Sequence, residues 1–264
     1  MNKLSRSLLF VPGNRPERYA KAAQSGAHAI IIDLEDAVAP VEKYTARENV
    51  ASWLVSQPAT MVRINGAATP WFEEDLELLK AHPEATVMLP KADAESIAAT
   101  VQALPGRPIN ALVETVKGFM QLREIAAVNE VKRMAFGSID FGVESGIADT
   151  ADAMTTIRTQ IVLESCFAEL DPPVDGVSVN FADEAIMLAE AQRARQLGFG
   201  GKLCIHPRQV AQVNAAFSPT AEQLDWAERV LAAIEQSDGG VTTVDGKMVD
   251  KPVVEQARRI IADV

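Results

Sequence analysis

Charged or polar side chains follow one short apolar run after another along this chain. They are Asp33, Glu35, Asp36, Arg63, Lys91, Glu114, Asp140 and His206. If the runs are parallel strands, the side chains that follow them meet at the carboxyl end of one sheet. Acids, a guanidinium and an ammonium group at that place could hold a divalent cation and an anionic substrate.

Glu114 and Asp140 are the acids with the clearest chemical meaning, because they follow the fifth and sixth apolar runs and would come from neighbouring strands. Two carboxylates that face one pocket repel each other unless a proton or a cation lies between them. Hard oxygen ligands, with other positions left to water and substrate, are typical of Mg²⁺. The alternative is that each carboxylate caps a following helix, which for Asp140 alone is the more common arrangement.

Arg63 ends the third run and presents a planar fork that could bind a carboxylate or a developing oxyanion. A structural ion pair with Glu35 or Asp36 is the alternative. Arg63 could form the ion pair and also bind substrate, because an arginine oriented by neighbouring acids is better placed for substrate. Asp33, Glu35 and Asp36 are too close in sequence to be metal ligands together, so at least one should orient Arg63 or hold metal-bound water.

Other positions carry weaker signals. The loop 11–16 follows the first run and opens a helix at Pro16, so its backbone amides, with Arg15 and Arg18, could receive phosphate groups. Lys91 could contact a phosphate or carboxylate, pair with a local acid or form a Schiff base, the last being least favoured because a metal could withdraw electrons instead. His206 is expected to be a hydrogen-bonded structural group near the site.

Strand and helix alternate through most of the chain. Short continuous apolar runs predict strands buried on both faces at 8–11, 29–32, 61–62, 87–89, 111–113, 134–136, 177–179 and 203–205. Segments of helical period lie between them. Eight such units predict an α/β fold, a (β/α)₈ TIM barrel, and 264 residues are close to the roughly 250 typical of one.

The end of the chain departs from this pattern. A helix is predicted over 220–236, then a two-strand turn at Asp245-Gly246, then a short helix opened by Pro252. We therefore predict a barrel domain over 1–236 and a C-terminal extension over 237–264. The extension would either pack on a barrel end or act as a lid that closes over the site.

Composition narrows the class of protein. The formal charge of −11, from 25 Lys and Arg against 36 Asp and Glu, argues against a general nucleic-acid-binding surface. Two widely separated cysteines, Cys166 and Cys204, suggest neither disulfides nor a metal-binding CxxC motif. No signal peptide or membrane span is apparent, so a cytoplasmic protein is expected.

Seven separated motifs carry a resemblance that covers nearly the whole chain. The chain resembles the citrate lyase β-subunit-like proteins of the HpcH/HpaI aldolase superfamily, close to the citramalyl- and malyl-CoA lyases. The matching segments, in order, are SLLFVPGN at 7–14, DLEDAV at 33–38, VRIN at 62–65, LPK at 89–91, ET at 114–115, CIHP at 204–207 and DGKMVD at 245–250.

The resemblance implies an Mg²⁺-dependent carbon–carbon lyase that cleaves a 3-hydroxyacyl thioester to an acyl-CoA, such as acetyl-CoA, and a 2-oxo acid. Glu114 and Asp140 would hold the metal, and Arg63 would bind the oxo acid, with Pro12, Arg15 and Lys91 also contacting substrate. Glu35 and Asp36 would steer Arg63 or metal-bound water. Asp250 would act as acid or base from a neighbouring subunit, in a homotrimer or hexamer.

Two departures from the family pattern leave the substrate open. Ser178-Val179-Asn180-Phe181 lacks an acid that relatives often carry after strand seven, and the loop after Asp140 is unusual. The thioester carrier is open as well, since citrate lyase β-subunits act on an acyl-carrier protein, although Asp250 favours coenzyme A. A malate-synthase-like or thioesterase activity and a non-catalytic regulatory barrel are the alternatives, and the convergent charges argue against the latter.

Overall fold

This computed structural model describes residues 4–236 and 242–262. The chain divides into two compact units, one formed by Leu4–Asn214 and one that begins at Ala215. Leu4–Asn214 contains every predicted site residue except Asp250.

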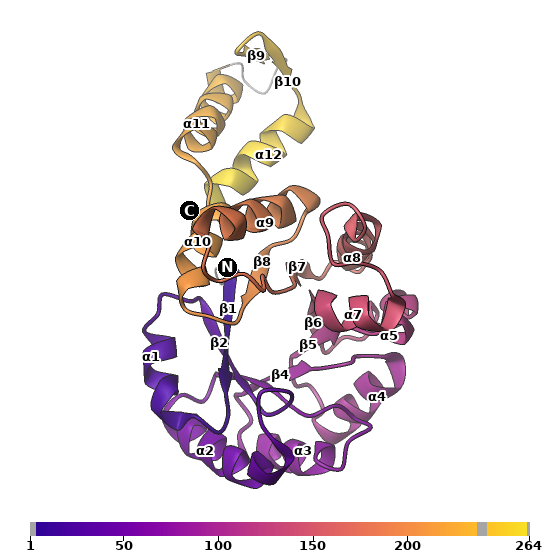
Figure 1. Cartoon of the computed structure of the whole chain (residues 1–264). Coiled ribbons are helices and arrows are strands. Elements are labelled where there is room, and N and C mark those ends of the chain that lie inside the picture. Colours follow the sequence, from indigo (N-terminus) through magenta and orange to yellow (C-terminus); the bar gives the residue numbers. More distant parts are fainter. Residues whose placement is uncertain (1–3, 237–241, 263–264) are drawn as a thin grey trace. The chain divides into compact units, whose positions relative to one another are not determined.

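Eight parallel strands close into a barrel in the order in which they occur along the chain (Figure 1). Closure comes from β1, which pairs with β2 on one side and with β8 on the other. The predicted (β/α)₈ barrel is therefore confirmed. The strands are β1 (Ser7–Pro12), β2 (Ala29–Asp33), β3 (Met61–Arg63), β4 (Thr86–Leu89), β5 (Ile109–Val113), β6 (Val131–Phe136), β7 (Asp171–Asp175) and β8 (Gly201–Cys204).

Helices connect the strands and surround them (Figure 1). Several begin at a side chain that accepts a backbone N–H, as Asp93 does for α4, Thr115 for α5 and Asp183 for α9. The helical elements are η1 (Pro16–Arg18), α1 (Tyr19–Ala23), η2 (Pro40–Glu42), α2 (Lys43–Ser56), α3 (Phe72–Ala81), α4 (Ala94–Ala103), α5 (Val116–Met120), α6 (Leu122–Ala126), α7 (Ser138–Ser145), α8 (Thr155–Phe167), α9 (Glu184–Leu197) and α10 (Arg208–Phe217).

One apolar side chain from nearly every strand packs into a buried layer of the core. The layer comprises Leu8, Ile31, Met88, Leu112, Ala135, Val174 and Leu203, with Met61 partly buried against it. Side chains two positions apart on a strand point to the same face. Asp33, Arg63 and Glu114 stand two positions beyond Ile31, Met61 and Leu112, so the strand period that builds the core also directs these charged groups into the barrel mouth.

The seventh strand is the one element that the apolar pattern misplaced. It was predicted at 177–179, but β7 is Asp171–Asp175, with the sequence Asp-Pro-Pro-Val-Asp. Two consecutive prolines lack the N–H groups of a strand ladder, and the pairing of β7 with β6 is accordingly irregular. Neither proline nor aspartate is typical of a buried strand, which is why the pattern did not reveal it.

A buried cluster of opposite charges allows this strand to end in an acid. Asp175 accepts hydrogen bonds from Nε of Arg158 at 2.8 Å and from Nζ of Lys202 at 3.1 Å. Burial would raise the pKa of Asp175, but the two cations outweigh it and hold the pKa below its usual value. A buried carboxylate is tolerated when it is paired in this way.

The unit that begins at Ala215 contains α11 (Ala221–Gln236), β9 (Thr242–Val244), β10 (Lys247–Val249) and α12 (Lys251–Ala262). β9 and β10 form the predicted antiparallel pair. Asp245 and Gly246, both with positive φ, make the turn between them. Ala227, Val230, Val249, Val254 and Ala257 form the core of this unit.

The predicted domain boundary at 236/237 borders residues 237–241, which lie outside the described part of the chain. The sequence pattern places helix α11 in the barrel domain 1–236, whereas it belongs to the unit that begins at Ala215. Its apolar face explains this, because Ala227 and Val230 pack with Val254 and Ala257 of α12.

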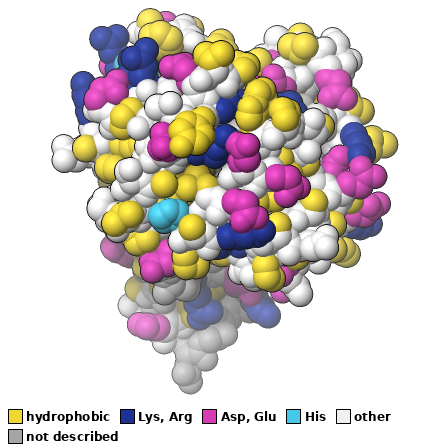
Figure 2. Space-filling model, turned by 90° about the horizontal axis from the view of Figure 1, so that it is seen from below, with side chains coloured by type: hydrophobic (Ala, Val, Ile, Leu, Met, Phe, Trp, Pro, Cys, Tyr) yellow, Lys and Arg dark blue, Asp and Glu magenta, His cyan; other side chains and the backbone are white. Residues whose placement is uncertain are grey.

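In the described residues, no helix has the length and apolar character needed to cross a membrane. Figure 2 shows one face of the molecule, on which basic side chains occur in small groups beside acidic and hydrophobic ones. That face has no continuous basic area of the kind that binds a phosphate backbone.

Candidate active site

A cavity of about 370 Å³ lies at the carboxyl ends of the barrel strands. Its charged lining is formed by Asp33, Asp36, Arg63, Glu114 and Asp140. Its apolar lining includes Phe10, Leu112, Phe136, Val177, Leu203 and Ile205. In a TIM barrel this is the end at which active sites lie, so the cavity is the candidate active site.

Arg63 is held in place by two acids and an aromatic ring. Its Nε and Nη2 donate to the two carboxylate oxygens of Asp33, each at 2.6 Å, and its Nη1 lies 3.1 Å from Oε2 of Glu35. The guanidinium carbon lies 4.7 Å from the centre of the Phe10 ring. Burial would lower the pKa of Arg63, but the bonds to Asp33 keep it raised. A guanidinium has more N–H donors than these contacts use, so donors remain for a ligand.

Asp33 therefore acts on Arg63 and on its own loop. Its oxygens also accept the backbone N–H groups of Glu35, at 2.9 Å, and Ala37, at 3.0 Å. With both oxygens engaged and the side chain fully buried, Asp33 has the geometry of a residue that orients Arg63. At least one of the three clustered acids was expected to orient Arg63. Asp33 does so, and Glu35 also contacts Nη1 of Arg63.

Glu35 links Arg63 to Lys91. One of its oxygens faces Nη1 of Arg63 and the other accepts a hydrogen bond from Nζ of Lys91. Burial raises the pKa of Glu35, although Arg63 and Lys91 oppose this. Lys91 has a positive φ of 48°, a strained conformation for lysine, two residues after the end of β4. Its side chain is about half exposed, so the ammonium group is accessible.

Glu114 is, like Asp33, a buried acid in the lining of the cavity. Its Oε1 accepts the backbone N–H of Lys91 at 2.9 Å and lies 3.8 Å from the Lys91 ammonium group. Burial and the nearby charge of Glu35 raise the pKa of Glu114 to about 8. The carboxylate of Glu114 is thus short of positive charge in the protein alone.

Asp140 lies in the first turn of α7, which follows β6, and lines the same cavity as Glu114. Asp36 lines the cavity as well, and the side chains of both Asp140 and Asp36 are exposed. Helix N-termini favour negative charge, so part of the repulsion on Asp140 is offset by its position. The alternative that Asp140 caps this helix does not hold, because the N-cap residue is Gly137 and the helix has no side-chain cap.

A buried polar network beneath Glu35 was not found from the sequence. Nζ of Lys43 donates to the carbonyls of Leu34 and Glu35, at 2.6 and 2.7 Å, and to Oδ1 of Asn65, at 2.7 Å. Asn65 in turn donates to Asp75. Burial lowers the pKa of Lys43. A lysine at the start of a polar helix is normally exposed, so its position in the sequence does not predict this support.

Three predicted residues are placed differently from this group. Among the described residues, Pro12 and Arg15 do not line the cavity, and neither do Glu35 and Lys91, which contact the lining residues Arg63 and Glu114. The amide of Gly13, in the same loop as Pro12 and Arg15, already donates to the carbonyl of Asp33 at 2.8 Å. The side chain of Arg15 is exposed. His206 stacks on Phe181, with ring centres 4.9 Å apart, and accepts the N–H of Arg208, in agreement with a structural role.

Asp250 belongs to the unit that begins at Ala215. There its carboxylate accepts the N–H of Val253 at 3.2 Å, at the start of α12. Its predicted role as an acid or base donated between subunits stays a prediction.

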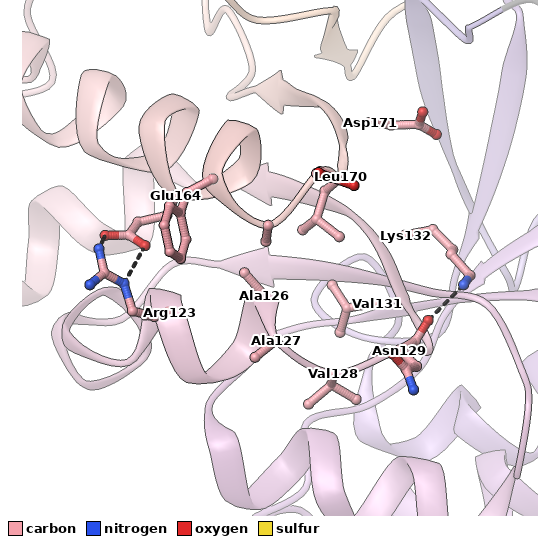
Figure 3. Close-up of a pocket in the computed structure, with 13 residues that line it drawn as sticks. Arg123, Ala126, Ala127, Val128, Asn129, Val131, Lys132, Glu164, Leu170 and Asp171 are labelled. Carbon is pink, nitrogen blue, oxygen red and sulfur yellow. Dashed lines mark hydrogen bonds and ion pairs between the residues drawn. The ribbon is translucent and has the colours of Figure 1, made fainter.

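A larger pocket of about 560 Å³ lies between α6 and the end of α8. It lies at the amino ends of β6 and β7, which is the end of the barrel opposite the candidate active site. Figure 3 shows that Arg123 is paired with Glu164 and that Lys132 donates to the carbonyl of Asn129. These charged groups engage partners within the pocket wall. In TIM barrels this end contributes to stability and the opposite end to catalysis, so we do not assign the chemistry to this pocket.

The comparisons with known proteins agree with the geometry. A model of the HpcH/HpaI aldolase/citrate lyase family matches residues 6–207. The citrate lyase subunit beta-like protein of Mycobacterium tuberculosis is 40% identical over 261 residues, covering 96% of this chain and 93% of the relative. A (3S)-malyl-CoA thioesterase of Cereibacter sphaeroides is 36% identical over 269 residues, covering 97% and 93%.

Among solved structures, the protein CitE of Mycobacterium tuberculosis, in complex with magnesium, acetoacetate and coenzyme A, superposes with a TM-score of 0.85. It is 35% identical in sequence, and the match covers 98% of this chain and 97% of that one. The barrel, the site at its carboxyl end and these matches together show that the chain belongs to the HpcH/HpaI aldolase/citrate lyase family, whose members are enzymes.

Proposed function

We propose that this chain is an Mg²⁺-dependent carbon–carbon lyase that cleaves a 3-hydroxyacyl thioester, of the citramalyl-, malyl- or citryl-CoA type, to an acyl-CoA and a 2-oxo acid. The observation that carries the proposal is that Glu114, Asp140 and Arg63 line one cavity. The magnesium, acetoacetate and coenzyme A held by the related CitE protein support it.

The donor set fits magnesium. In the described part of the chain, no group of three or more His, Cys, Asp or Glu side chains could hold a metal. The protein would therefore supply only the two carboxylates of Glu114 and Asp140, and substrate and water would supply the rest. Mg²⁺ usually keeps several waters and binds through one or two carboxylates, so this small set suits it. When bound, Mg²⁺ would act as a Lewis acid towards the substrate oxygens.

The reaction balances because the substrate hydroxyl loses one proton and the α-carbon of the thioester gains one. The substrate hydroxyl loses its proton and becomes the carbonyl of the 2-oxo acid, while the carbon–carbon bond to the thioester α-carbon breaks. The electron pair of that bond passes to the thioester as an enolate, which takes a proton on its α-carbon to give the acyl-CoA.

The chain's own residues bind the substrate and protonate the enolate. The remaining N–H donors of Arg63 bind the oxo-acid fragment and stabilise the charge that develops on its oxygen. Asp33 and Glu35 hold the guanidinium in that position. Lys91 is held by Glu35, and its half-exposed ammonium group can contact the thioester substrate. In this scheme Asp250 of a neighbouring subunit protonates the enolate.

The lining of the cavity favours one class of substrate within this proposal. Arg63 is the basic residue among its lining residues and is already paired with acids, whereas four acids line the same space. A substrate with a second free carboxylate would meet stronger repulsion from these acids than a substrate with one. Phe10, Val177 and Ile205 instead offer an apolar wall, so we favour citramalyl- or malyl-type thioesters over citryl thioesters.

A hydrolytic outcome is the second candidate, because a relative 36% identical over nearly the whole chain is named a (3S)-malyl-CoA thioesterase. In that reaction water attacks the thioester carbonyl and free coenzyme A leaves. The acyl-carrier-protein reaction of citrate lyase β-subunits is a further candidate function, since such a subunit from Leuconostoc mesenteroides is 32% identical.

One panel of assays separates these functions. Malyl-, methylmalyl-, citramalyl- and citryl-CoA are incubated with and without Mg²⁺, and acetyl-CoA, propionyl-CoA, free coenzyme A and the 2-oxo acid are measured separately. We expect an acyl-CoA and an equal amount of 2-oxo acid, only with Mg²⁺. Free coenzyme A without 2-oxo acid would show hydrolysis, and no product from any thioester would refute the proposal.

A further inference from the structure

Gly137 occupies the junction between β6 and α7, beside Glu114 and three residues before Asp140. It follows the last residue of β6 and is the N-cap of α7, the helix whose first turn carries Asp140. Its N–H donates to the carbonyl of Val113 at 2.9 Å, and Val113 is the residue before Glu114. Gly137 also lines the cavity.

The space where a side chain of residue 137 would lie is filled by Glu114. A Cβ atom built on Gly137 would lie 2.4 Å from Cβ and 2.6 Å from Oε2 of Glu114. Real Cβ atoms essentially never show contacts this short, and the first of them involves a rigid part of Glu114 next to its backbone. Either the carboxylate or the β6–α7 junction would have to move.

The absence of a side chain leaves α7 without a side-chain N-cap, which weakens the helix slightly. Ser, Thr, Asn and Asp are the best N-caps, because their oxygen accepts an N–H of the first turn. In α7 the N-cap makes no such bond. Gly137 has a negative φ of −92°, so its backbone conformation does not demand glycine. The position of Glu114, in contrast, does require glycine at residue 137.

We propose that Gly137 is the positioning residue for the metal-ligand pair. Its missing side chain lets Glu114 lie against the start of α7 and thereby fixes the separation of the carboxylates of Glu114 and Asp140. The inference rests on the proposed function, because it takes these two acids as the ligands. It adds a residue that touches neither metal nor substrate and acts through Glu114.

The test is Gly137→Ala, with Mn²⁺ alone as the probe and free Mn²⁺ measured by electron paramagnetic resonance. We expect Mn²⁺ affinity to fall roughly 10–100-fold, as it does when groups that orient metal ligands are lost. Gly66→Ala is the matched control, since its Cβ would meet only Cδ of Lys91, at an ordinary 3.8 Å. We expect its Mn²⁺ affinity to stay within about twofold of wild type.

A second measurement covers failure of Gly137→Ala to fold. Glu114→Gly removes the obstructing Cβ and carboxylate, so the double variant Glu114→Gly/Gly137→Ala should fold as Glu114→Gly does, with far less loss of stability from the added alanine than in wild type. An equal loss in both backgrounds would overturn the inference, as would wild-type Mn²⁺ affinity in folded Gly137→Ala. If wild-type protein binds no Mn²⁺, or Glu114→Ala binds it normally, the metal site itself is refuted and the inference fails with it.

Discussion

Replacement of Glu114 by glutamine should stabilise the metal-free protein while removing its activity. Burial and Glu35 raise the pKa of this carboxyl from its ordinary value of 4.5 to about 8. The folded state therefore binds the proton more tightly than the unfolded chain does. The stability that this proton confers is fully present below about pH 4.5 and is lost as pH rises to about 8. Glutamine keeps the shape of the side chain and carries no charge to lose.

The size of the effect follows from the same shift. A shift of more than three pKa units corresponds to an upper limit of roughly 5 kcal/mol at pH 9. Lys91 is half exposed and can move towards the carboxylate, so we expect roughly 2–3 kcal/mol. Glu35 also has a raised pKa and remains in the variant, so the pH dependence should shrink and not vanish.

Urea unfolding at pH 5, 7 and 9, with EDTA present, measures this. We expect the wild-type midpoint to fall between pH 5 and pH 9 by more than that of Glu114→Gln, and the variant to be the more stable protein at pH 9. Glu77→Gln is the control, because Glu77 is exposed and, within the described part of the chain, its ion pair is with Lys80 on the surface of α3. Equal pH dependence in Glu114→Gln and wild type would refute the reasoning.

The remaining predictions concern activity. Arg63→Lys should lower kcat/KM roughly 100-fold, because an ammonium group cannot replace the bidentate hydrogen bonds to Asp33 and still reach the substrate. A kcat/KM near that of wild type in steady-state kinetics would contradict this. EDTA should abolish turnover and added Mg²⁺ restore it, and activity in metal-free buffer would show that Glu114 and Asp140 have another role. Asp250→Asn should bind substrate but cleave it slowly, and mixing its chains with Arg63→Ala chains should recover part of the activity if Asp250 acts between subunits. No recovery in verified mixed oligomers would place Asp250 in its own subunit's site.

The barrel could be predicted from the sequence because its strands are short apolar runs and its charged residues follow them at a fixed step. Asp33, Arg63 and Glu114 extend the strand period of the core by one step, so their convergence follows from the same pattern. The pattern failed at β7, where Asp175 is buried by pairing with Arg158 and Lys202, which lie outside that strand. Pairings between distant residues leave no periodic signal.

Pairings between distant residues also explain why the rest of the site could not be predicted from the sequence. Arg63 could be predicted to pair with an acid, but the choice of Asp33 over Asp36 depends on where the loop after β2 turns. Lys43 and Gly137 carry no chemical signal in the sequence, because the first resembles a surface lysine and the second a flexible joint. Their importance appears only when Leu34, Glu35 and Glu114 are seen beside them.

Closure of the barrel by β1 and β8 has a consequence for how the chain reaches its native state. Leu9 pairs with Cys204, so the first strand lacks one of its two neighbours until nearly the whole barrel has been synthesised. Contacts between residues so distant in sequence make folding slow. Until β8 arrives, the open edge of β1 can pair with the wrong strand, including one from another nascent chain. We therefore expect fragments that end before β8 to aggregate during synthesis, whereas the closed ring leaves no edge on which such association could begin.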